Sequence, residues 1–304
     1  MIDIQAVRHS YGERAALQDV TFAVPAGETF GLLGPNGSGK STLFKLLTTT
    51  LPVQAGTVRV AGVDVMADAN AVRRRIGVVF QHPALDPFLT VRENLKHHGH
   101  LYGMTGADLA ERIEARLKDL AVADRAGEYV KSLSGGLRRR VEIAKAPLPE
   151  PAILLMDEPS TGLDPNARRE LWSLLAGLVQ SRGLSVFAST HLMDEAERFD
   201  RVALLDGGRV VACGTPEELK RQVGRQVLRL HAGDSSSLRE ILSDAPEAAV
   251  RGENGRLVVD GLVPEAVLSR LMQARRPDDA ISVGPPTMDD VFERMTGRPF
   301  EPTA

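Results

Sequence analysis

The sequence predicts an α/β fold for most of the chain, followed by a small α+β domain. Short β-rich segments alternate with helical patterns, which is typical of an α/β core. Residues 153–156 and 185–189 are almost entirely apolar or small, as in parallel strands that are covered on both faces. After Lys220 the chain contains no lysine, and a second series of elements begins. We therefore expect an α/β domain over residues 1–220 and an accessory domain over residues 221–304.

Each element expected in the first domain depends on a local pattern. The strand segments are rich in β-branched and apolar residues and end at turn residues. They are expected at residues 2–8, 20–24, 29–33, 58–60, 76–80, 153–156 and 185–189. The helical segments repeat apolar residues with roughly the helical period. They are expected at residues 41–47, 107–120, 137–146, 167–180 and 194–199.

The second domain is expected to combine strands with helices. Glu253-Asn254-Gly255 is a turn signal between two extended segments. The last helix has Thr287 as its cap, with Asp290 three residues on, and Gly297 closes it. Strands are expected at residues 227–231 and 256–259, and helices at 237–242, 264–275 and 287–296.

The bulk composition is that of an ordinary folded protein, with 43% hydrophobic and 25% charged residues among 304. The net charge of -3 gives no electrostatic case for nucleic-acid binding, and the arginine runs 73–75 and 138–140 are interpreted as solvated helix faces. The single cysteine, Cys213, cannot form an internal disulfide, which fits a reducing compartment. The first residues lack signal-peptide character, and apolar runs such as 152–156 are far shorter than the ~20 residues of a membrane span.

Residues 34–42 form a glycine-rich loop after a predicted strand and before a predicted helix, which is the context of a phosphate-binding loop. The glycines allow backbone N–H groups to turn inward around a phosphate, and the helix start adds partial positive charge. Lys40 is expected to bridge the β- and γ-phosphates, and the Ser41 hydroxyl to hold Mg²⁺. The motif alone does not separate ATPases from kinases or GTPases. The predicted binding residues are Gly34, Pro35, Asn36, Gly37, Ser38, Gly39, Lys40, Ser41 and Thr42.

Two carboxylates end the apolar strand at residues 153–156. The carboxyl end of a buried parallel strand lies at the ligand crevice of an open α/β sheet, beside the phosphate loop. Asp157 is therefore expected to orient the Mg²⁺ coordination shell. Glu158 is expected to polarise the attacking water as a general base.

Further motifs make residues 1–220 resemble the ATP-binding cassette (ABC) family. Leu133-Ser134-Gly135-Gly136 resembles the family signature, and residues 160–164 match its D-loop. Asp157 and Glu158 match its second nucleotide motif. Other matches are the Q-loop glutamine, the switch histidine and the aromatic residue that stacks on adenine. These residues are Gln81, His191 and Tyr11.

The resemblance implies a P-loop NTPase core with a helical signature subdomain. It also implies a head-to-tail homodimer or heterodimer that traps two ATP molecules with Mg²⁺. Ser134, Gly135 and Gly136 of one subunit would then contact the nucleotide bound by the other, as would Asp164 of the D-loop. Gln81 would sense the γ-phosphate and the metal-bound water. His191 would contact the γ-phosphate and hold the water in line. Outside this series of motifs, a single glutamine, histidine or tyrosine is more often a surface or core residue.

Two features depart from the family pattern. Leu137 stands where many members carry glutamine, and leucine cannot donate a side-chain hydrogen bond. Pro147, Pro149 and Pro151 stand where the family usually continues in helix, and Pro147 is expected to end the signature helix near Ala146.

The resemblance extends to segments that select a partner. Residues 82–95 look like the family's transporter-coupling region. They are followed by His97, His98 and His100, for which a helix with exposed histidines is a better interpretation than a metal cluster. Residues 286–297 resemble the C-terminal helix of bacterial ATPase subunits in drug, antibiotic-resistance and polysaccharide exporters.

We therefore expect an ATP-hydrolysing subunit of an exporter for drugs, antibiotics, polysaccharides or lipids. Its integral membrane permease would be a separate chain, and the ATPase would be cytoplasmic and peripheral at the inner face of the cell membrane. A soluble ABC-type ATPase that remodels a ribosome, DNA or a cofactor-assembly complex is the alternative. A non-hydrolysing scaffold is disfavoured because Glu158 and His191 are both present. The transported substrate lies outside the prediction, because its recognition belongs to the membrane subunit.

Overall fold

A computed structural model describes most of the chain, which divides into two compact units, Met1–Val210 and Val211–Ala304. The boundary expected from the sequence, after residue 220, lies inside helix α7 (Pro216–Val223) of the second unit. Among the described residues, no helix combines the length and the apolar character needed to cross a lipid bilayer. The described residues are 1–82, 84–232, 236–242, 249–251, 256–260, 263–276 and 278–300.

The first unit begins with an antiparallel sheet in the order β2-β1-β4-β5. Its strands alternate buried and exposed side chains, so that one face is in the core. β1 and β2 are longer than expected, because their ladder continues to the pair Tyr11 and Arg14 beyond the apolar alternation. The strands are β1 (Ile2–Tyr11), β2 (Arg14–Val24), β4 (Ala55–Val60) and β5 (Val63–Asp64).

A second sheet has the order β10-β9-β3-β8-β7-β6, and the strands from β9 to β6 pair in parallel. The expected parallel core is therefore confirmed, and every residue of β7 is buried. β9 and β10 were not predicted from the sequence. The strands are β3 (Thr29–Leu33), β6 (Ile76–Val79), β7 (Ile153–Asp157), β8 (Ser185–Thr190), β9 (Arg201–Asp206) and β10 (Arg209–Gly214).

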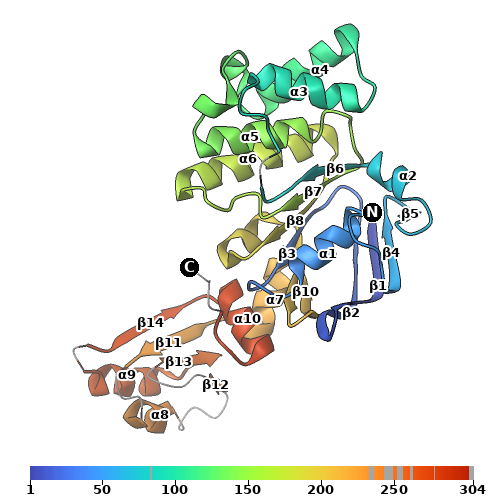
Figure 1. Cartoon of the computed structure of the whole chain (residues 1–304). Helices are drawn as coiled ribbons and strands as arrows, with labels where there is room; N and C mark the ends of the chain where they lie inside the picture. Colours follow the sequence, from blue (N-terminus) through green and yellow to red (C-terminus); the bar gives the residue numbers. More distant parts are fainter. Residues whose placement is uncertain are drawn as a thin grey trace. The chain divides into compact units, whose positions relative to one another are not determined.

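Helix α1 (Lys40–Leu47) lies between the two sheets (Figure 1). It contacts β2 and β4 of the antiparallel sheet and β7 and β8 of the parallel one. Its apolar side chains, including the fully buried Leu43 and Phe44, join the faces of both sheets into one core. The start of α1 is thereby fixed at the carboxyl ends of β3, β7 and β8.

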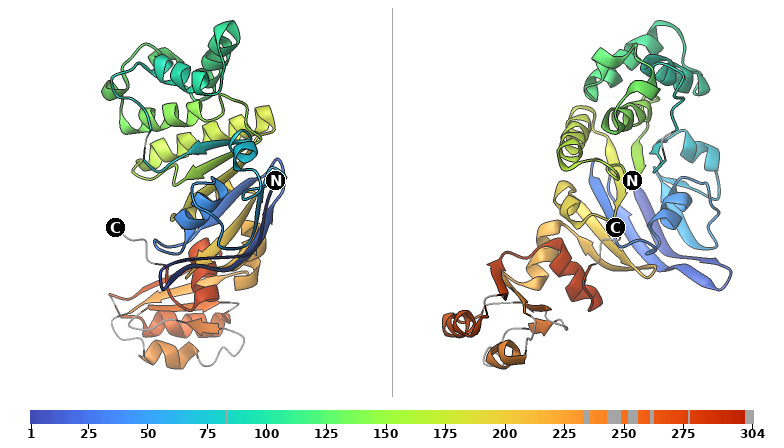
Figure 2. Two further views of the ribbon diagram at one scale, coloured as in Figure 1. Left: turned by 45° about the vertical axis from the view of Figure 1, so that its right-hand side comes forward. Right: turned by 60° about the vertical axis from the view of Figure 1, so that its left-hand side comes forward.

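Four further helices of the first unit lie together beside β6 and β7 (Figures 1 and 2). α3, α4 and α5 pack against one another, and α6 contacts α4. α5 ends at Lys145, as Pro147 predicts, because proline cannot continue a helix. These helices are α3 (Val91–Leu101), α4 (Gly106–Asp119), α5 (Gly135–Lys145) and α6 (Pro165–Arg182).

The remaining helical elements of this unit are short. The helix expected at residues 194–199 is a 3-10 helix, η3 (Met193–Arg198), because the segment offers only about two turns before the chain extends again. The others are α2 (Ala69–Arg73), η1 (Ala123–Arg125) and η2 (Val130–Ser132).

The second unit is built on an antiparallel sheet in the order β12-β13-β11-β14. Buried leucines and valines of β11 and β13 form its core with α8 and α9. β14 was not expected from the sequence, and the turn signal at residues 253–255 lies outside the described residues. The elements are β11 (Val227–His231), α8 (Ser236–Leu242), β12 (Ala249–Arg251), β13 (Arg256–Asp260), α9 (Glu265–Ala274), β14 (Ala280–Gly284) and α10 (Met288–Thr296).

Helix α10 has the expected ends. Thr287 forms a capping box with Asp290, and Gly297 closes the helix in the left-handed conformation at φ 73°. Ion pairs hold the helix to the sheet, and one of them joins Asp290 to Arg229 of β11. A second joins Arg294 to the buried Asp260 at 3.0 Å.

Candidate active site

The glycine-rich loop joins β3 to α1, and two of its glycines are required by close backbone approaches. A Cβ atom at Gly34 would lie 2.2 Å from the carbonyl oxygen of Leu205 in β9. Gly39 has φ 111°, and a Cβ atom there would lie 2.5 Å from the carbonyl oxygen of Ala16. Both approaches exclude a side chain, so the loop is fixed against β9 and β2. The loop is half open to solvent, because Asn36, Gly37 and Ser41 are exposed whereas Ser38 is buried.

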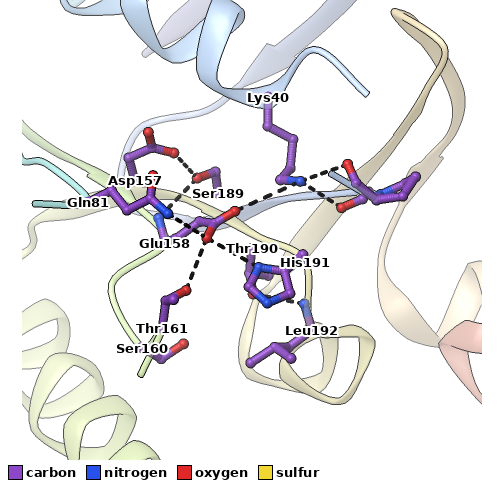
Figure 3. A network of polar contacts seen from close by, with 12 residues as sticks. Lys40, Gln81, Asp157, Glu158, Ser160, Thr161, Ser189, Thr190, His191 and Leu192 are labelled. Carbon is purple, nitrogen blue, oxygen red and sulfur yellow. Dashed lines mark hydrogen bonds and ion pairs between the residues drawn. The ribbon is translucent and has the colours of Figure 1, made fainter. Parts of the chain in front are cut away.

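Lys40 projects from the first turn of α1 into the site. Its Nζ donates to the carbonyl oxygens of Gly34 at 2.7 Å and Pro35 at 3.0 Å (Figure 3). The same Nζ lies 4.0 Å from Glu158 Oε1. Burial lowers the pKa of Lys40, while the negative charges of Glu158 and Asp157 oppose that shift. A cation is thus held under the loop where a phosphate would need it.

Glu158 is the centre of the polar network in Figure 3. Its Oε2 accepts hydrogen bonds from Thr161 Oγ1 at 3.0 Å and Gln81 Nε2 at 3.2 Å. His191 Nδ1 lies 3.2 Å from the same oxygen, without the alignment of a hydrogen bond. The structure therefore brings together four predicted residues of the site, Lys40, Gln81, Glu158 and His191.

The backbone at Glu158 is strained. Its φ is 47°, in the left-handed region that glycine and asparagine favour over longer side chains. The conformation is stabilised by the Glu158 N–H, which donates to Ser189 O at 3.1 Å. Because the chain turns sharply here, successive carboxylates of Asp157 and Glu158 make different contacts.

Asp157 ends β7 and is buried, and its carboxylate accepts a hydrogen bond from the Ser189 hydroxyl. Burial raises the pKa of Asp157, and the Ser189 hydrogen bond opposes that shift. A Mg²⁺ ion fits the donors expected here, since Asp157, Ser41 and Gln81 all offer oxygen ligands. Mg²⁺ commonly uses one or two protein carboxylates together with substrate phosphates, so a single aspartate is sufficient.

A buried hydroxyl in the loop supports binding of a polar group. Ser38 is 3% exposed, and among the described residues its Oγ has no hydrogen-bond partner. A buried polar atom without a partner is costly unless a ligand or water completes it. The loop residues Ser38, Ser41 and Thr42 thus supply hydroxyls at the same end of α1 as Lys40.

Tyr11 lies apart from this network, at the end of β1. It is 48% exposed and meets the ring of His9 edge-on, with centroids 4.9 Å apart. Its ladder partner Arg14 lies next to the loop, since a Cβ atom at Gly37 would be 3.6 Å from Arg14 Nη2. An exposed ring beside the loop fits the predicted adenine contact, which stays a prediction.

The signature and D-loop residues form helix starts at the surface. Ser134 is the N-cap of α5, and its Oγ accepts the Leu137 N–H at 3.3 Å. Gly135 is exposed and Gly136 half-buried. Asp164 is the N-cap of α6, and the N–H groups of residues 166 and 167 lower the pKa of its carboxylate. No hydrogen bond or ion pair joins these residues to Lys40 or Glu158 within the described part of the chain.

Several residues that support the network were not predicted from the sequence. Thr161 and Ser189 contact the two carboxylates, and Arg139 donates to backbone carbonyls on three sides. The interpretation of residues 138–140 as a solvated face is wrong for Arg139, which is 7% exposed. Its neighbours point elsewhere, because successive residues of a helix face different directions. The arginines at residues 73–75 are exposed, as expected.

The histidines of α3 also differ from the expectation in part. His97 and His100 are exposed, whereas His98 is turned inward beside Tyr102, with ring centroids 5.1 Å apart. Burial, together with the positive charge of Lys145, lowers the pKa of His98 to about 4. This difference could not be predicted, because one helical turn carries histidines on both its exposed and its packed side.

Comparison with known proteins finds relatives for both units. The family described as "ABC transporter" matches residues 17–161, and "ATP-binding protein DrrA1-3-like, C-terminal domain" matches residues 214–296. The chain is 39% identical over 303 residues to "Nod factor export ATP-binding protein I" of Rhizobium etli, covering 99% of this chain and 94% of the relative. The same-named protein of Bradyrhizobium diazoefficiens is 38% identical, with 99% and 97% covered.

Solved structures resemble the first unit. An ATP-binding subunit of an ABC transporter matches with a TM-score of 0.65 at 31% identity, covering 74% of this chain and 93% of that one. A dimeric ATP-binding cassette, in a post-hydrolysis state with ADP and Pi, matches with a TM-score of 0.63 at 30% identity, covering 71% and 98%.

Proposed function

The chain belongs to the ABC transporter family as an ATP-binding subunit with ATPase activity, and we propose that it drives an exporter whose membrane-spanning subunit is a separate chain. The observation that carries the proposal is the convergence of Lys40, Gln81 and His191 on the carboxylate of Glu158, beside the phosphate loop. A scaffold that only bound nucleotide would not need Gln81, Glu158 and His191.

In this proposal the loop N–H groups and Lys40 hold the phosphates of ATP, and Asp157, Ser41 and Gln81 hold Mg²⁺. The metal ion would neutralise charge on the β- and γ-phosphates. Glu158 accepts the proton of the attacking water, and Gln81 fixes the direction of its carboxylate through the 3.2 Å hydrogen bond. His191 contacts the γ-phosphate and keeps the water in line. Adenine stacks on the exposed ring of Tyr11.

The exposed helix starts favour a dimer. Ser134, Gly135 and Gly136 present the N-terminus of α5 at the surface, where N–H groups and helix polarity attract an anion. Asp164 is exposed at the start of α6, where its own carboxylate accepts the N–H groups of residues 166 and 167, so it would contact the other subunit as a capped helix start. In a head-to-tail dimer these groups complete the nucleotide site of the other subunit, an arrangement supported by the dimeric cassette that this chain resembles.

A groove beside α3 is the proposed contact for the membrane subunit. It is lined by Ala84, Asp86, Leu89, Asn94, His97 and Leu101 among others, within the region that resembles the coupling segment. Large apolar side chains stand exposed around it, with Phe88 at 71% and Leu101 at 83%. Exposed apolar side chains mark interaction sites where they are contiguous; Leu101 lines the groove itself, and Phe88 is the neighbour of its lining residue Leu89. In this proposal the protein works on the inner, cytoplasmic side of a membrane.

Export is favoured over import by the relatives, whose printed name is that of export proteins, and by the match of the second unit to the DrrA1-3-like C-terminal domain. The alternative is a soluble ATPase that remodels a ribosome, DNA or a cofactor-assembly complex. In that case the groove beside α3 would not bind a membrane subunit. The class of cargo follows from the membrane subunit rather than from this chain.

The test is to purify the tagged protein from detergent-solubilised membranes and identify its companions by mass spectrometry. A multi-span protein is expected with the wild type, and F88D/L101D should lose it while keeping the ATPase rate of the isolated chain. A variant with the exposed Met66 changed, M66D, is the control and should keep the partner. Recovery of ribosomal proteins in place of a multi-span protein would favour the alternative.

A further inference from the structure

A buried arginine of α5 holds three segments of the site by their backbone. Arg139 Nε donates to Pro159 O at 2.7 Å, and Nη1 donates to Phe80 O at 2.7 Å. Nη2 donates to the carbonyl oxygens of Asp157 and Glu158, both at 3.2 Å. One guanidinium therefore joins the residue before Gln81, the end of β7 and the start of the D-loop.

This set of partners fixes geometry more than it adds stability. All four are carbonyl oxygens, and a guanidinium is the only side chain with enough planar donors to reach them together. Burial of the cation carries a desolvation penalty and lowers the pKa of Arg139, which the charges of Glu142 and Asp157 oppose. The residue that these bonds flank, Glu158, is the one with the left-handed φ of 47°.

The same face of α5 holds the other end of the Gln81 segment. Glu142 and Lys145 follow Arg139 at intervals of one helical turn, and both are buried. Lys145 Nζ donates to Ala84 O at 2.9 Å, and Glu142 Oε2 accepts the Ala84 N–H at 3.2 Å. An ion pair of 3.0 Å joins the two side chains. The segment is thus bound to α5 on both sides of Gln81.

We propose that Arg139 is a positioning residue for Glu158 and Gln81, acting through the backbone carbonyls on either side of their side chains. The proposal rests on the proposed role of Glu158 as general base. Without Arg139, the strained turn at Glu158 relaxes and the carboxylate leaves the water's line of attack. Because α5 begins at Ser134, the same arginine also ties the signature to the base of its own subunit.

The first test is the steady-state kinetics of R139Q. We expect kcat to fall roughly 10- to 100-fold, the scale of a misplacement of about 1 Å, while KM for ATP stays within twofold. R139K keeps the charge but cannot bind four carbonyls, so its kcat should lie between that of the wild type and that of R139Q. R139K also keeps the test valid if R139Q fails to fold.

R116Q is the matched control. Arg116 of α4 is 3% exposed and pairs with Asp119 at 3.3 Å, so its loss removes a buried arginine without touching the site. It should lower the unfolding temperature and leave kcat within twofold. An equal loss of kcat in R116Q and R139Q would overturn the proposal, as would a higher KM with unchanged kcat in R139Q.

A double-mutant cycle separates this inference from the proposed function. If Arg139 acts through Glu158, R139Q/E158Q should turn over as slowly as E158Q alone, because the base is already lost. Multiplied losses would show an independent role and overturn the inference. Wild-type turnover in E158Q would instead remove Glu158 as the base and with it the proposed function. If R139Q turned over at the wild-type rate while E158Q was slow, the role of Arg139 would be refuted and the proposed function would stand.

Discussion

The ammonium of Lys40 lies 4.0 Å from Glu158 Oε1 and also donates to the carbonyls of Gly34 and Pro35. In the proposed mechanism this relationship couples the phosphate loop to the carboxylate that would activate water. A γ-phosphate that paired with the ammonium would remove a cationic neighbour from Glu158 and so raise its basicity. ATP binding and activation of the general base would then be linked through one side chain.

The loss of Lys40 should abolish nucleotide binding. K40A removes the cation that neutralises the β- and γ-phosphates, and we expect the Kd for a fluorescent ATP analogue to rise at least about 100-fold, or about 3 kcal/mol. Lys45 lies on the same helix and is exposed, so K45A is the control and should bind normally. Binding by K40A within threefold of the wild type would contradict the role of Lys40.

The loss of the Glu158 carboxylate should separate binding from hydrolysis. E158Q should bind ATP as the wild type does but turn over about 10²- to 10⁴-fold more slowly, the range expected for a lost general base. With saturating Mg-ATP it should run as a dimer in size-exclusion chromatography with light scattering. The exposed Glu111 of α4 provides the control E111Q, which should keep wild-type turnover. A monomeric E158Q under these conditions would count against the shared nucleotide site.

His98 should make the stability depend on pH. Its pKa is lowered to about 4 in the folded protein, from the ordinary value of 6.5, so the unfolded chain takes up a proton first as the pH falls. Stability from the neutral imidazole is therefore complete above pH 6.5 and is lost between 6.5 and 4. At pH 5 the loss is at most about 2 kcal/mol. H98Q should flatten the pH profile of urea unfolding, whereas the exposed-site variant H97Q should not.

The ion pair between α10 and β11 should stabilise the second unit. D290A leaves the Arg229 guanidinium without its carboxylate and removes the capping box of Thr287, and both losses destabilise the helix start. We expect a loss of about 3–5 kcal/mol in denaturant unfolding followed by a probe on the second unit. The exposed neighbour Asp289 gives the control D289A. Equal effects of the two variants would refute the contribution of the ion pair.

Local patterns were enough to predict the elements that carry the site. The phosphate loop and the acidic end of β7 follow from short spacings and from apolar runs, which are properties of adjacent residues. The roles of Gln81 and His191 came from the order of motifs along the chain. The structure then placed both within 3.2 Å of Glu158.

Residues whose role depends on distant partners could not be predicted. Arg139 stands in an arginine run like that at residues 73–75, and only the packing of α5 beside β7 distinguishes it. His98 differs from His97 only by its direction on α3. β9 and β10 were not predicted, although apolar runs at residues 202–205 and 210–212 flank the Gly207-Gly208 turn, which is a local hairpin signal.

The left-handed backbone at Glu158 means that conformational stability and ATPase activity favour different residues at this position. Glycine there would relieve on the order of 1 kcal/mol of strain and remove the carboxylate, so we expect E158G to gain backbone stability and to lose most of its ATPase activity. Engineering for thermostability alone would therefore be drawn toward an inactive variant at residue 158. A screen of this protein therefore needs to measure ATPase activity as well as stability. Selection for stability alone would favour variants that lack the Glu158 carboxylate.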